Sequence, residues 1–283
     1  MLLDHTSEDF EIVTVQSGDR SVRSRKFGEI FHPVVGPMAE AVGLHVRQQG
    51  LVERAARAGG RFVIWDVGLG AAANAIAVIE AFAGWADLRA RIELHSFDLS
   101  DGALRFALAH ANELGYLARH AVAVHSLIGQ GAWAETPLQW RFHPGSFRET
   151  MPLAPAPHAI LYDPYSPQSN PDMWTLDHFT RLHGCLFAEL PCLLTNYTRS
   201  TAVRVTLLLA GFFVGRGHAT GEKDETTIAA NDLALLETPL GLDWLAGLRR
   251  STNAAPLRAG ISGPAAISPE DWSRLAAHPQ FAG

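Results

Sequence analysis

Cysteine is scarce in this sequence: among 283 residues only Cys185 and Cys192 are cysteines. Both lie in apolar surroundings near an expected helix-to-strand turn, which is typical of small buried hydrophobic residues. A disulfide between them stays open, whereas a metal site would need further ligands that the neighbouring sequence does not offer. This cysteine usage excludes a disulfide-rich secreted fold and predicts a protein of the reducing cytoplasm.

Long apolar runs are also missing, since none reaches the roughly 18–20 residues needed to span a bilayer. The N-terminal stretch MLLDHTSEDFE is acidic and lacks the basic start and apolar core of a signal peptide. Basic residues are outnumbered as well: 23 Lys and Arg against 29 Asp and Glu give a formal charge of −6. We therefore expect no membrane partner, and nucleic-acid binding would depend on a local basic patch.

What the sequence does contain is enough apolar material, 47% of residues, for a large core. We expect three parts: a hairpin and helix extension (1–58), a core (59–232), and a tail with a short helix (233–283). In the first part, Phe10–Lys26 has hairpin chemistry, and a helix is predicted from Met38 to about Arg57. The basic residues of the hairpin either protect a sheet edge or contact phosphate: Arg20, Arg23, Arg25 and Lys26.

The central motif is RFVIWDVGLGAAAN, residues 61–74. An apolar strand ends in Asp66, Gly68 and Gly70 form a sharp turn, and a helix follows near Asn74. Glycine allows bare backbone to approach a ligand, and the helix start offers unpaired N–H groups. This order is typical of a turn that binds an adenosine-containing cofactor, although a glycine-rich turn without a ligand would have the same pattern. We predict that Asp66, Gly68, Gly70 and Asn74 bind the cofactor.

A second strand, residues 91–97, ends at Asp98. A carboxylate at this position typically accepts hydrogen bonds from both hydroxyls of a ribose. Capping of the following helix by Ser100 or Asp101 is compatible with that role. The interval from Gly70 to Asp98 exceeds the usual ~20 residues of dinucleotide enzymes, which disfavours a nicotinamide cofactor.

A further buried strand, AILY, delivers Asp163 to the sheet edge where open α/β sheets bind ligands. In the turn Asp163-Pro164-Tyr165, a carboxylate and a carbonyl can accept the hydrogens of an amine, and a ring can flank the substrate or a cation. Alternatively the segment is a proline-rich turn, with Asn170 capping a helix from Pro171 to about Leu190. We predict a catalytic role for Asp163 and Tyr165.

The remaining strands predict the sheet. Strands are expected near 140–147, 192–197, 212–215 and 226–230, and the last two form a hairpin that inserts one antiparallel strand. Nicotinamide-dependent dehydrogenases of the Rossmann fold lack such an antiparallel strand, whereas class I methyltransferases have it. We therefore predict an α/β, Rossmann-like, mixed seven-stranded sheet with helices on both faces.

From about Phe27 to Asn231 the sequence resembles the MnmC-type methyltransferase domain, the family that makes 5-methylaminomethyl-2-thiouridine in tRNA. The matching segments are GEIFHPVVGPMAEA, DVGLG, YDPYSPQSNPDMW, LLTNYTRSTAVRVTLLLAGFFV and GEKDETTIAA. The resemblance implies S-adenosyl-L-methionine as cofactor and places the family's proposed catalytic aspartate at Asp163. It also implies tRNA as a partner, with a separate FAD oxidase acting upstream, because the oxidase domain of some relatives is absent.

Two positions depart from the family pattern. Pro164 stands where glycine is usual, and Ser146 stands where the family tends to have the Gly-Asp that contacts adenine. We still assign Ser146 to the cofactor site. Glu29 and His32 are secondary candidates for shaping the pocket. Two other hypotheses remain: a methyltransferase acting on a different amine or base, and a nicotinamide-dependent oxidoreductase supported by the glycine turn and Asp98.

Overall fold

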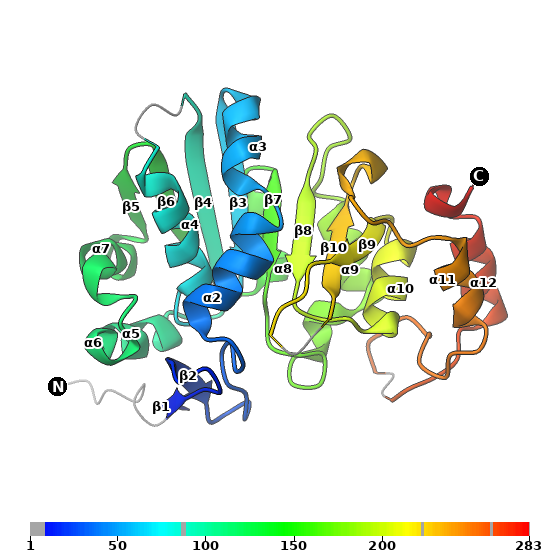
Figure 1. Cartoon of the computed structure of the whole chain (residues 1–283), viewed down its shortest axis with the longest axis horizontal. Helices are drawn as coiled ribbons and strands as arrows, with labels where there is room; N and C mark the ends of the chain where they lie inside the picture. Colours follow the sequence, from blue (N-terminus) through cyan, green and yellow to red (C-terminus); the bar gives the residue numbers. More distant parts are fainter. Residues whose placement is uncertain (1–8, 86–88, 222–223, 261–262, 283) are drawn as a thin grey trace.

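The computed structural model describes residues 9–85, 89–221, 224–260 and 263–282. An eight-stranded mixed sheet forms the centre, and a separate two-stranded sheet lies below it in Figure 1. This small sheet is the predicted hairpin, made of β1 (Phe10–Thr14) and β2 (Arg20–Ser24). Most of the stretch interpreted as lacking a signal peptide, residues 1–8, lies outside the described residues.

The large sheet runs from edge to edge in the order β5, β6, β4, β3, β7, β8, β10, β9. Strands β6, β4, β3, β7 and β8 are parallel, and β10 lies antiparallel between β8 and β9. In chain order the strands are β3 (Arg61–Val67), β4 (Arg91–Asp98), β5 (Ala132–Glu135), β6 (Leu138–Pro144), β7 (Ala159–Tyr162), β8 (Leu193–Asn196), β9 (Phe213–Gly217) and β10 (Thr226–Ala230).

The predicted antiparallel insertion is confirmed, but the predicted strand count of seven is wrong. The additional strand is β5, which pairs antiparallel with β6 and sets Trp133 opposite Trp140. Only Thr136 and Pro137 separate the two strands, so a short hairpin occupies a segment that looked irregular in sequence. The extra strand lies at the edge beyond β6, away from the strands that carry the predicted site.

Helices cover both faces of the sheet (Figure 1). One layer contains α2 (Pro37–Ala41), the π-helical segment η1 (Val42–Arg47), α3 (Leu51–Ala58), α4 (Ala73–Ala83), α5 (Gly102–Ala109), α6 (Ala111–Leu114) and α7 (Ala121–Gln130). The other contains α8 (Phe147–Thr150), α9 (Leu176–His183), α10 (Thr201–Leu209), α11 (Leu242–Leu248) and α12 (Pro269–Ala276). Short 3₁₀ turns connect them: η2 (Ala118–His120), η3 (Met151–Leu153), η4 (Pro171–Trp174), η5 (Leu233–Leu235) and η6 (Pro279–Phe281).

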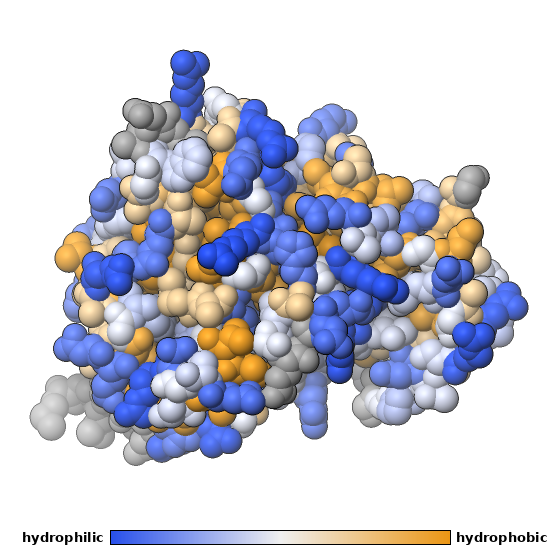
Figure 2. Space-filling view, in the orientation of Figure 1, coloured by the Kyte–Doolittle hydropathy of each residue, from blue (hydrophilic) through white to orange (hydrophobic). Residues whose placement is uncertain are grey.

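Central strand β3 is buried on both faces, as expected of a parallel strand between two helical layers. Phe62 and Ile64 pack with the first layer, whereas Val63 and Trp65 pack with the second. The sheet and its helices therefore fix the position at which β3 ends and the glycine turn begins. On the face seen in Figure 2, hydrophilic and hydrophobic residues are interspersed, and one hydrophobic patch lies between the hairpin and α2.

The helix predicted from Met38 to Arg57 is interrupted. Helix α2 continues directly into η1, and α3 begins only after Gly50, whose φ of 54° is left-handed. In this arrangement the Nδ1 atom of His45 lies 2.8 Å from Thr195 Oγ1 on β8. Burial lowers the pKa of His45 to about 3, so its ring is neutral inside the molecule.

The helix predicted from Pro171 to Leu190 is also divided. Thr175 is extended and separates η4 from α9, and its Oγ1 atom accepts a 3.2 Å hydrogen bond from the backbone N–H of His178. Asn170 makes no side-chain cap, and α9 ends at His183, with Gly184 as its C-cap. The residue that caps α9 is thus Thr175 and not Asn170. The sequence does not distinguish them, because both residue types are common N-caps.

The predicted terminal helix is confirmed as α12, which Ser268 caps by accepting a 3.1 Å hydrogen bond from Asp271 N–H. Helix α11 was not predicted. The Gln280 side chain bonds the backbone of Val214 and Leu240, which fastens the tail to β9. The division of the chain at residues 58 and 232 stays a prediction. The part up to residue 58 contributes to one large core cluster, and the part after residue 232 contributes to the other.

Cys192 is buried, Cys185 is half-buried, and both are free thiols. Burial raises the pKa of Cys192 to about 12, which agrees with its predicted role as a small hydrophobic residue. Within the described ranges, no helix has the length and apolar character needed to cross a membrane.

Candidate active site

A cavity of about 980 Å³ opens at the carboxyl ends of the parallel strands. Its walls include the loops that follow the strands, the hairpin and the N-terminal segment around residues 27–33, and the starts of helices α2, α4, α5 and α9. The hairpin of β1 and β2 lies against this edge in Figure 1. The volume is at the upper end of the range of about 300–1,000 Å³ for ligand sites, enough for a cofactor and an acceptor group together.

The glycine turn has a structural requirement for both of its glycines. Gly68 has φ of 93°, and a Cβ there would lie 2.6 Å from the carbonyl oxygen of Asp163. Gly70 has φ of 49°, and a Cβ there would lie 3.2 Å from the ring of Phe31. The glycines therefore let the turn approach the Asp163 loop and the N-terminal segment, in addition to exposing backbone to the cavity.

Asp98 holds the glycine turn in place. Its Oδ2 atom accepts a 3.0 Å hydrogen bond from Gly70 N–H, and Oδ1 accepts one of 2.7 Å from Leu99 N–H. Burial raises the pKa of the Asp98 carboxyl, while these backbone donors act in the opposite direction. A carboxylate has about four acceptor sites, so Asp98 can bind ribose hydroxyls while it retains both bonds to the backbone.

Asp66 lies behind the turn and is not among the residues that line the cavity. It is 1% exposed, and its Oδ2 atom accepts a 2.7 Å hydrogen bond from Ser96, which in turn accepts one from Trp140 Nε1. Burial raises the pKa of Asp66 to about 8. A direct contact between Asp66 and a cofactor stays a prediction, and the structure places this side chain in an internal polar network.

Asp163 and Asn74 meet inside the cavity. Asn74 Nδ2 donates a 2.8 Å hydrogen bond to Asp163 Oδ2, which connects the start of α4 with the loop after β7. Asn74 Oδ1 is buried and has no hydrogen-bond partner among the described residues. The hydroxyl of Tyr197 donates a 3.1 Å bond to the carbonyl of Pro164 and so fixes the turn that bears Asp163. An unused acceptor therefore lies beside a carboxylate, as binding of an N–H donor requires.

The aromatic wall of the cavity combines two distant segments. The ring of Tyr165 stacks on Phe27 at 4.3 Å between centroids, and Phe31 lies 5.7 Å away. Burial raises the pKa of Tyr165 to about 12, so its hydroxyl stays protonated. Glu29 accepts a 3.1 Å hydrogen bond from Ser166 N–H and a second from its hydroxyl. These contacts join the N-terminal segment to the loop predicted to be catalytic.

Ser146 also lines the cavity, as predicted, and begins α8. Its carbonyl accepts hydrogen bonds from Glu149 and Thr150 N–H, and its side chain makes no capping hydrogen bond. The predicted site residues in the cavity wall are thus Gly68, Gly70, Asn74, Asp98, Ser146, Asp163 and Tyr165, with Glu29 and His32 beside them.

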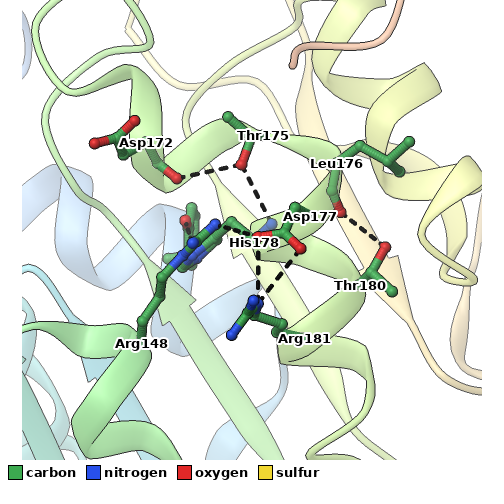
Figure 3. A network of polar contacts seen from close by, with 9 residues as sticks. Arg148, Asp172, Thr175, Leu176, Asp177, His178, Thr180 and Arg181 are labelled. Atoms are coloured by element: carbon green, nitrogen blue, oxygen red, sulfur yellow. Dashed lines mark hydrogen bonds and ion pairs between the residues drawn. The ribbon is translucent and has the colours of Figure 1, made fainter. Parts of the chain in front are cut away.

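A second polar network, at the start of α9, was missed in the sequence (Figure 3). Arg148 Nη2 lies 2.7 Å from Asp177 Oδ2, and Arg181 pairs with the same carboxylate. The buried ring of His178 lies 3.0 Å from the Tyr162 hydroxyl, and burial lowers the pKa of His178 to about 4. Arg148, Asp177 and His178 all line the cavity. Nothing in the local sequence distinguishes them from ordinary helix residues.

The comparisons with known proteins agree with this geometry. A sequence model of the family described as S-adenosyl-L-methionine-dependent methyltransferase matches residues 143–232. This segment contains the loop with Ser146, the loop with Asp163 and the closing hairpin of β9 and β10. The match therefore covers the part of the chain that contains Ser146, Asp163 and the antiparallel strand β10.

Two similar proteins are both named tRNA 5-methylaminomethyl-2-thiouridine biosynthesis bifunctional protein MnmC. That of Ectopseudomonas mendocina is 28% identical over 267 residues, covering 88% of this chain and 40% of the relative. That of Ralstonia nicotianae is 30% identical over 232 residues, covering 73% of this chain and 32% of the relative. The chain thus matches about two fifths or less of these relatives' length.

Among solved structures, the crystal structure of MNMC2 from Aquifex aeolicus aligns with a TM-score of 0.68. The alignment covers 94% of this chain and 82% of that protein at 20% identity, which shows a shared fold. The chain therefore carries an S-adenosyl-L-methionine-dependent methyltransferase domain that is homologous to the methyltransferase domain of the MnmC proteins.

Proposed function

We propose that this protein transfers a methyl group to a primary amine, the aminomethyl group of a modified wobble uridine in tRNA. S-adenosyl-L-methionine supplies the methyl group. The residues that would hold this cofactor are the Gly68–Gly70 turn, Asp98 and Ser146, all in the cavity wall. The cavity wall carries more carboxylates than Lys and Arg side chains, which suits a sulfonium cation. The basic side chains are Lys26 and Arg148, and the carboxylates are Asp9, Glu29, Glu40, Asp98, Asp163, Asp172 and Asp177.

The observation that carries the proposal is the pairing of Asp163 with Asn74. A protonated amine has no lone pair, so the acceptor has to be bound in, or converted to, its neutral form before it can attack a methyl group. The Asp163 carboxylate can accept an amine hydrogen, and the Asn74 amide holds one of its oxygens in place through the 2.8 Å hydrogen bond. A fixed acceptor orients the lone pair of the nitrogen, and such positioning contributes a large share of a rate acceleration.

The tRNA acceptor is inferred from the relatives, whose name states the biosynthesis of 5-methylaminomethyl-2-thiouridine in tRNA. The hairpin supports it with exposed basic side chains next to the cavity, which can contact phosphates: Arg20, Arg23, Arg25 and Lys26. Such an acceptor places the protein in the cytoplasm. It also calls for an enzyme that supplies the free aminomethyl group, and we infer a separate FAD oxidase for that step.

Mass spectrometry of wobble-uridine modifications tests the proposal. A strain without this protein should accumulate the aminomethyl nucleoside, and adding the purified protein with S-adenosyl-L-methionine to that tRNA should convert it to the methylaminomethyl form. Unchanged nucleosides in both experiments would contradict the tRNA acceptor. A thermal-shift comparison of S-adenosylhomocysteine with NAD(H) addresses the nicotinamide hypothesis, and we expect stabilisation by S-adenosylhomocysteine alone.

The charge of the cavity favours one other acceptor class, a small cationic amine. Carboxylates of the cavity wall such as Asp172 and Glu40 attract a cation and repel a polyanion. The same assay with free polyamines in place of tRNA separates the two acceptors. Methylation of a polyamine at a rate that tRNA does not match would select the small amine.

A further inference from the structure

The side chain of His32 lies between two carboxylates, those of Asp163 and Glu40. Its Nε2 atom is 3.8 Å from Asp163 Oδ2, and its Nδ1 atom is 3.9 Å from Glu40 Oε2. The three side chains are only 10–14% exposed, and all three line the cavity. They come from three elements: the segment after the hairpin, the loop after β7, and the first turn of α2.

The backbone of His32 is unusual. Its φ is 49°, and among the described residues Ala72 is the only other non-glycine residue with a positive φ. Left-handed backbone costs a non-glycine residue about 1–2 kcal/mol and occurs preferentially at functional sites. The conformation is held by neighbouring contacts, since the Phe31 N–H donates to the Val22 carbonyl and the Phe31 carbonyl accepts from Ser21. The segment thus directs the imidazole between the two carboxylates at some cost in backbone energy.

Other groups around His32 restrict what this array can do. Asn74 already donates to the same Asp163 oxygen that faces His32, so this oxygen has an oriented hydrogen bond. Glu29 is held by Ser166, and Tyr197 by the Pro164 carbonyl. His45, buried beneath, interacts electrostatically with His32, and its pKa is lowered to about 3 by burial. Because His45 stays neutral, the groups able to exchange protons with His32 are Asp163 and Glu40.

We propose that Asp163, His32 and Glu40 form a proton relay that removes the proton lost by the acceptor amine. The proposal rests on the proposed function, because the relay serves amine methylation. The neutral amine uses its lone pair to form a bond to the methyl carbon and becomes an ammonium. The bond between that carbon and the sulfonium sulfur breaks in the same step, its electron pair stays on sulfur, and the neutral thioether S-adenosylhomocysteine leaves. Asp163 takes one N–H proton from that ammonium and passes it to His32 Nε2, while the Nδ1–H of His32 donates toward Glu40. Separations of 3.8–3.9 Å are too long for hydrogen bonds in the free protein, and such contacts commonly shorten when substrate binds.

Asp163 is the catalytic residue in this scheme, and His32 and Glu40 act through it. The relay explains why a histidine occupies a left-handed position that glycine or asparagine would adopt more easily. An imidazole can accept a proton on one nitrogen and release one from the other near neutral pH. Neither glycine nor asparagine can do so.

Chemical rescue separates this role from a structural one. His32→Gly relieves the backbone and opens space for free imidazole, and we expect single-turnover methyl transfer to fall about 10-fold. Added imidazole should restore most of the rate in this variant and leave the parent unchanged. Glu40→Gln should slow transfer about 3-fold and show little additional loss when combined with His32→Gly, since both act on one relay. His32→Asn, which suits a positive φ, should be as slow as His32→Gly without being rescued.

A second measurement does not depend on activity. In the full chain with S-adenosylhomocysteine bound, the ring ¹⁵N signals of His32 should shift when Asp163→Asn or Glu40→Gln is introduced. Asp177→Asn is the matched control, because this cavity carboxylate pairs with Arg148 and Arg181. We expect it to leave the His32 signals in place.

The outcomes distinguish the relay from the proposed function. If the parent does not methylate the tRNA acceptor but the His32 signals respond to both substitutions, the acceptor assignment fails and the Asp163–His32–Glu40 coupling stands. If the parent methylates tRNA and His32→Gly is equally fast, or slow without rescue by imidazole, the relay is overturned. If the His32 ring signals change in neither the Asp163→Asn nor the Glu40→Gln variant, the relay is overturned as well, whatever the methylation activity.

Discussion

The two halves of the cavity are built in different ways. The proposed cofactor side consists of the Gly68–Gly70 turn and Asp98, which follow adjacent parallel strands and are joined by a hydrogen bond from backbone to side chain. The proposed acceptor side joins Asp163, Ser166 and their neighbours to Glu29 and His32, and Glu29 lies 137 positions before its partner Ser166. One half is made by the sheet itself, and the other by a segment that folds over the sheet.

This difference predicts how each half responds to substitution. On the cofactor side, the binding carboxylate also supports the backbone, so affinity and stability should change together. On the acceptor side, carboxylates contact side chains of another segment, so rate should change while the fold persists. The predictions below test this separation.

The largest effect is expected for Asp163→Asn. The substitution keeps the shape and the contact with Asn74 but removes the charge and the base, so methyl transfer should slow by about 10²–10⁴-fold. Binding of S-adenosylhomocysteine and the melting temperature should change little. Single-turnover methylation, measured beside calorimetry and a melting curve, checks this.

A normal melting curve with near wild-type transfer would show that Asp163 is only structural. The separation between the halves would then fail, and the removal of the amine proton would have to be assigned to Glu29 or His32. A large loss of cofactor affinity in this variant would also contradict it, by placing Asp163 on the cofactor side.

Asp98→Ala should have the next largest effect, on binding. Loss of the buried acceptor that serves ribose and the Gly70 N–H should weaken S-adenosylhomocysteine binding by about 1–3 kcal/mol, roughly 5- to 150-fold. The melting temperature should fall as well, because Gly70 loses its partner. Asp101→Ala is the matched control, since Asp101 pairs at the surface with Arg105 and should change affinity little. Unchanged calorimetric affinity for the Asp98 variant would refute the ribose assignment.

Glu29→Gln sharpens the comparison from the acceptor side. The amide oxygen can still accept from the Ser166 N–H, but the NH2 group that replaces the other oxygen cannot accept from the Ser166 hydroxyl, and the charge that strengthens both hydrogen bonds is lost. Neutral and charged hydrogen bonds differ by about 0.5–1.5 kcal/mol, so kcat/KM for the acceptor should fall roughly 2- to 10-fold. Cofactor affinity should stay constant. Glu11→Gln on the hairpin, which pairs with Arg23 and Arg25 at the surface, is the control. Weaker cofactor binding in the Glu29 variant would contradict the separation.

The same contrast explains what the sequence could predict. Gly68, Gly70 and Asp98 follow recognisable strand patterns, and parallel strand ends meet at one edge, so their proximity was predictable. The pairing of Glu29 with Ser166 and of His32 with Asp163 depends on how the N-terminal segment crosses that edge, which no local pattern specifies. Phe27, Phe31 and Tyr197 were missed for this reason.

Two failures have local causes. The strand β5 was missed because a two-residue connection, Thr136 and Pro137, hid a hairpin within an irregular segment. The break at η1 was missed because its apolar residues keep helical spacing while the helix widens to a π-turn. Asp66 has the strand-end position of a ligand-binding residue, but its side chain points to Ser96 on the neighbouring strand instead of into the cavity.

The smallest effect on activity is expected for Asp66→Asn, which tests whether Asp66 belongs to the cofactor side at all. Its pKa in the fold is about 8, mainly through burial, against an ordinary value of 3.8. Between these values the folded state binds more protons than the unfolded state, so this group lowers stability as pH rises from about 4 to 8, by at most about 1.4 kcal/mol per unit. The buried His178 acts with the opposite sign: its pKa of about 4 lies below the ordinary 6.5, so stability is lost as pH falls through that interval.

The substitution Asp66→Asn removes the ionisation of Asp66 and keeps a polar group beside Ser96. The stability of the variant relative to the parent should therefore be higher at pH 9 than at pH 5.5, with unchanged affinity for S-adenosylhomocysteine, as measured by urea unfolding at both pH values and by calorimetry. An equal stability difference at both pH values would contradict the buried, neutral Asp66, and lost affinity would place Asp66 in the cofactor site, as its position at the end of β3 first suggested.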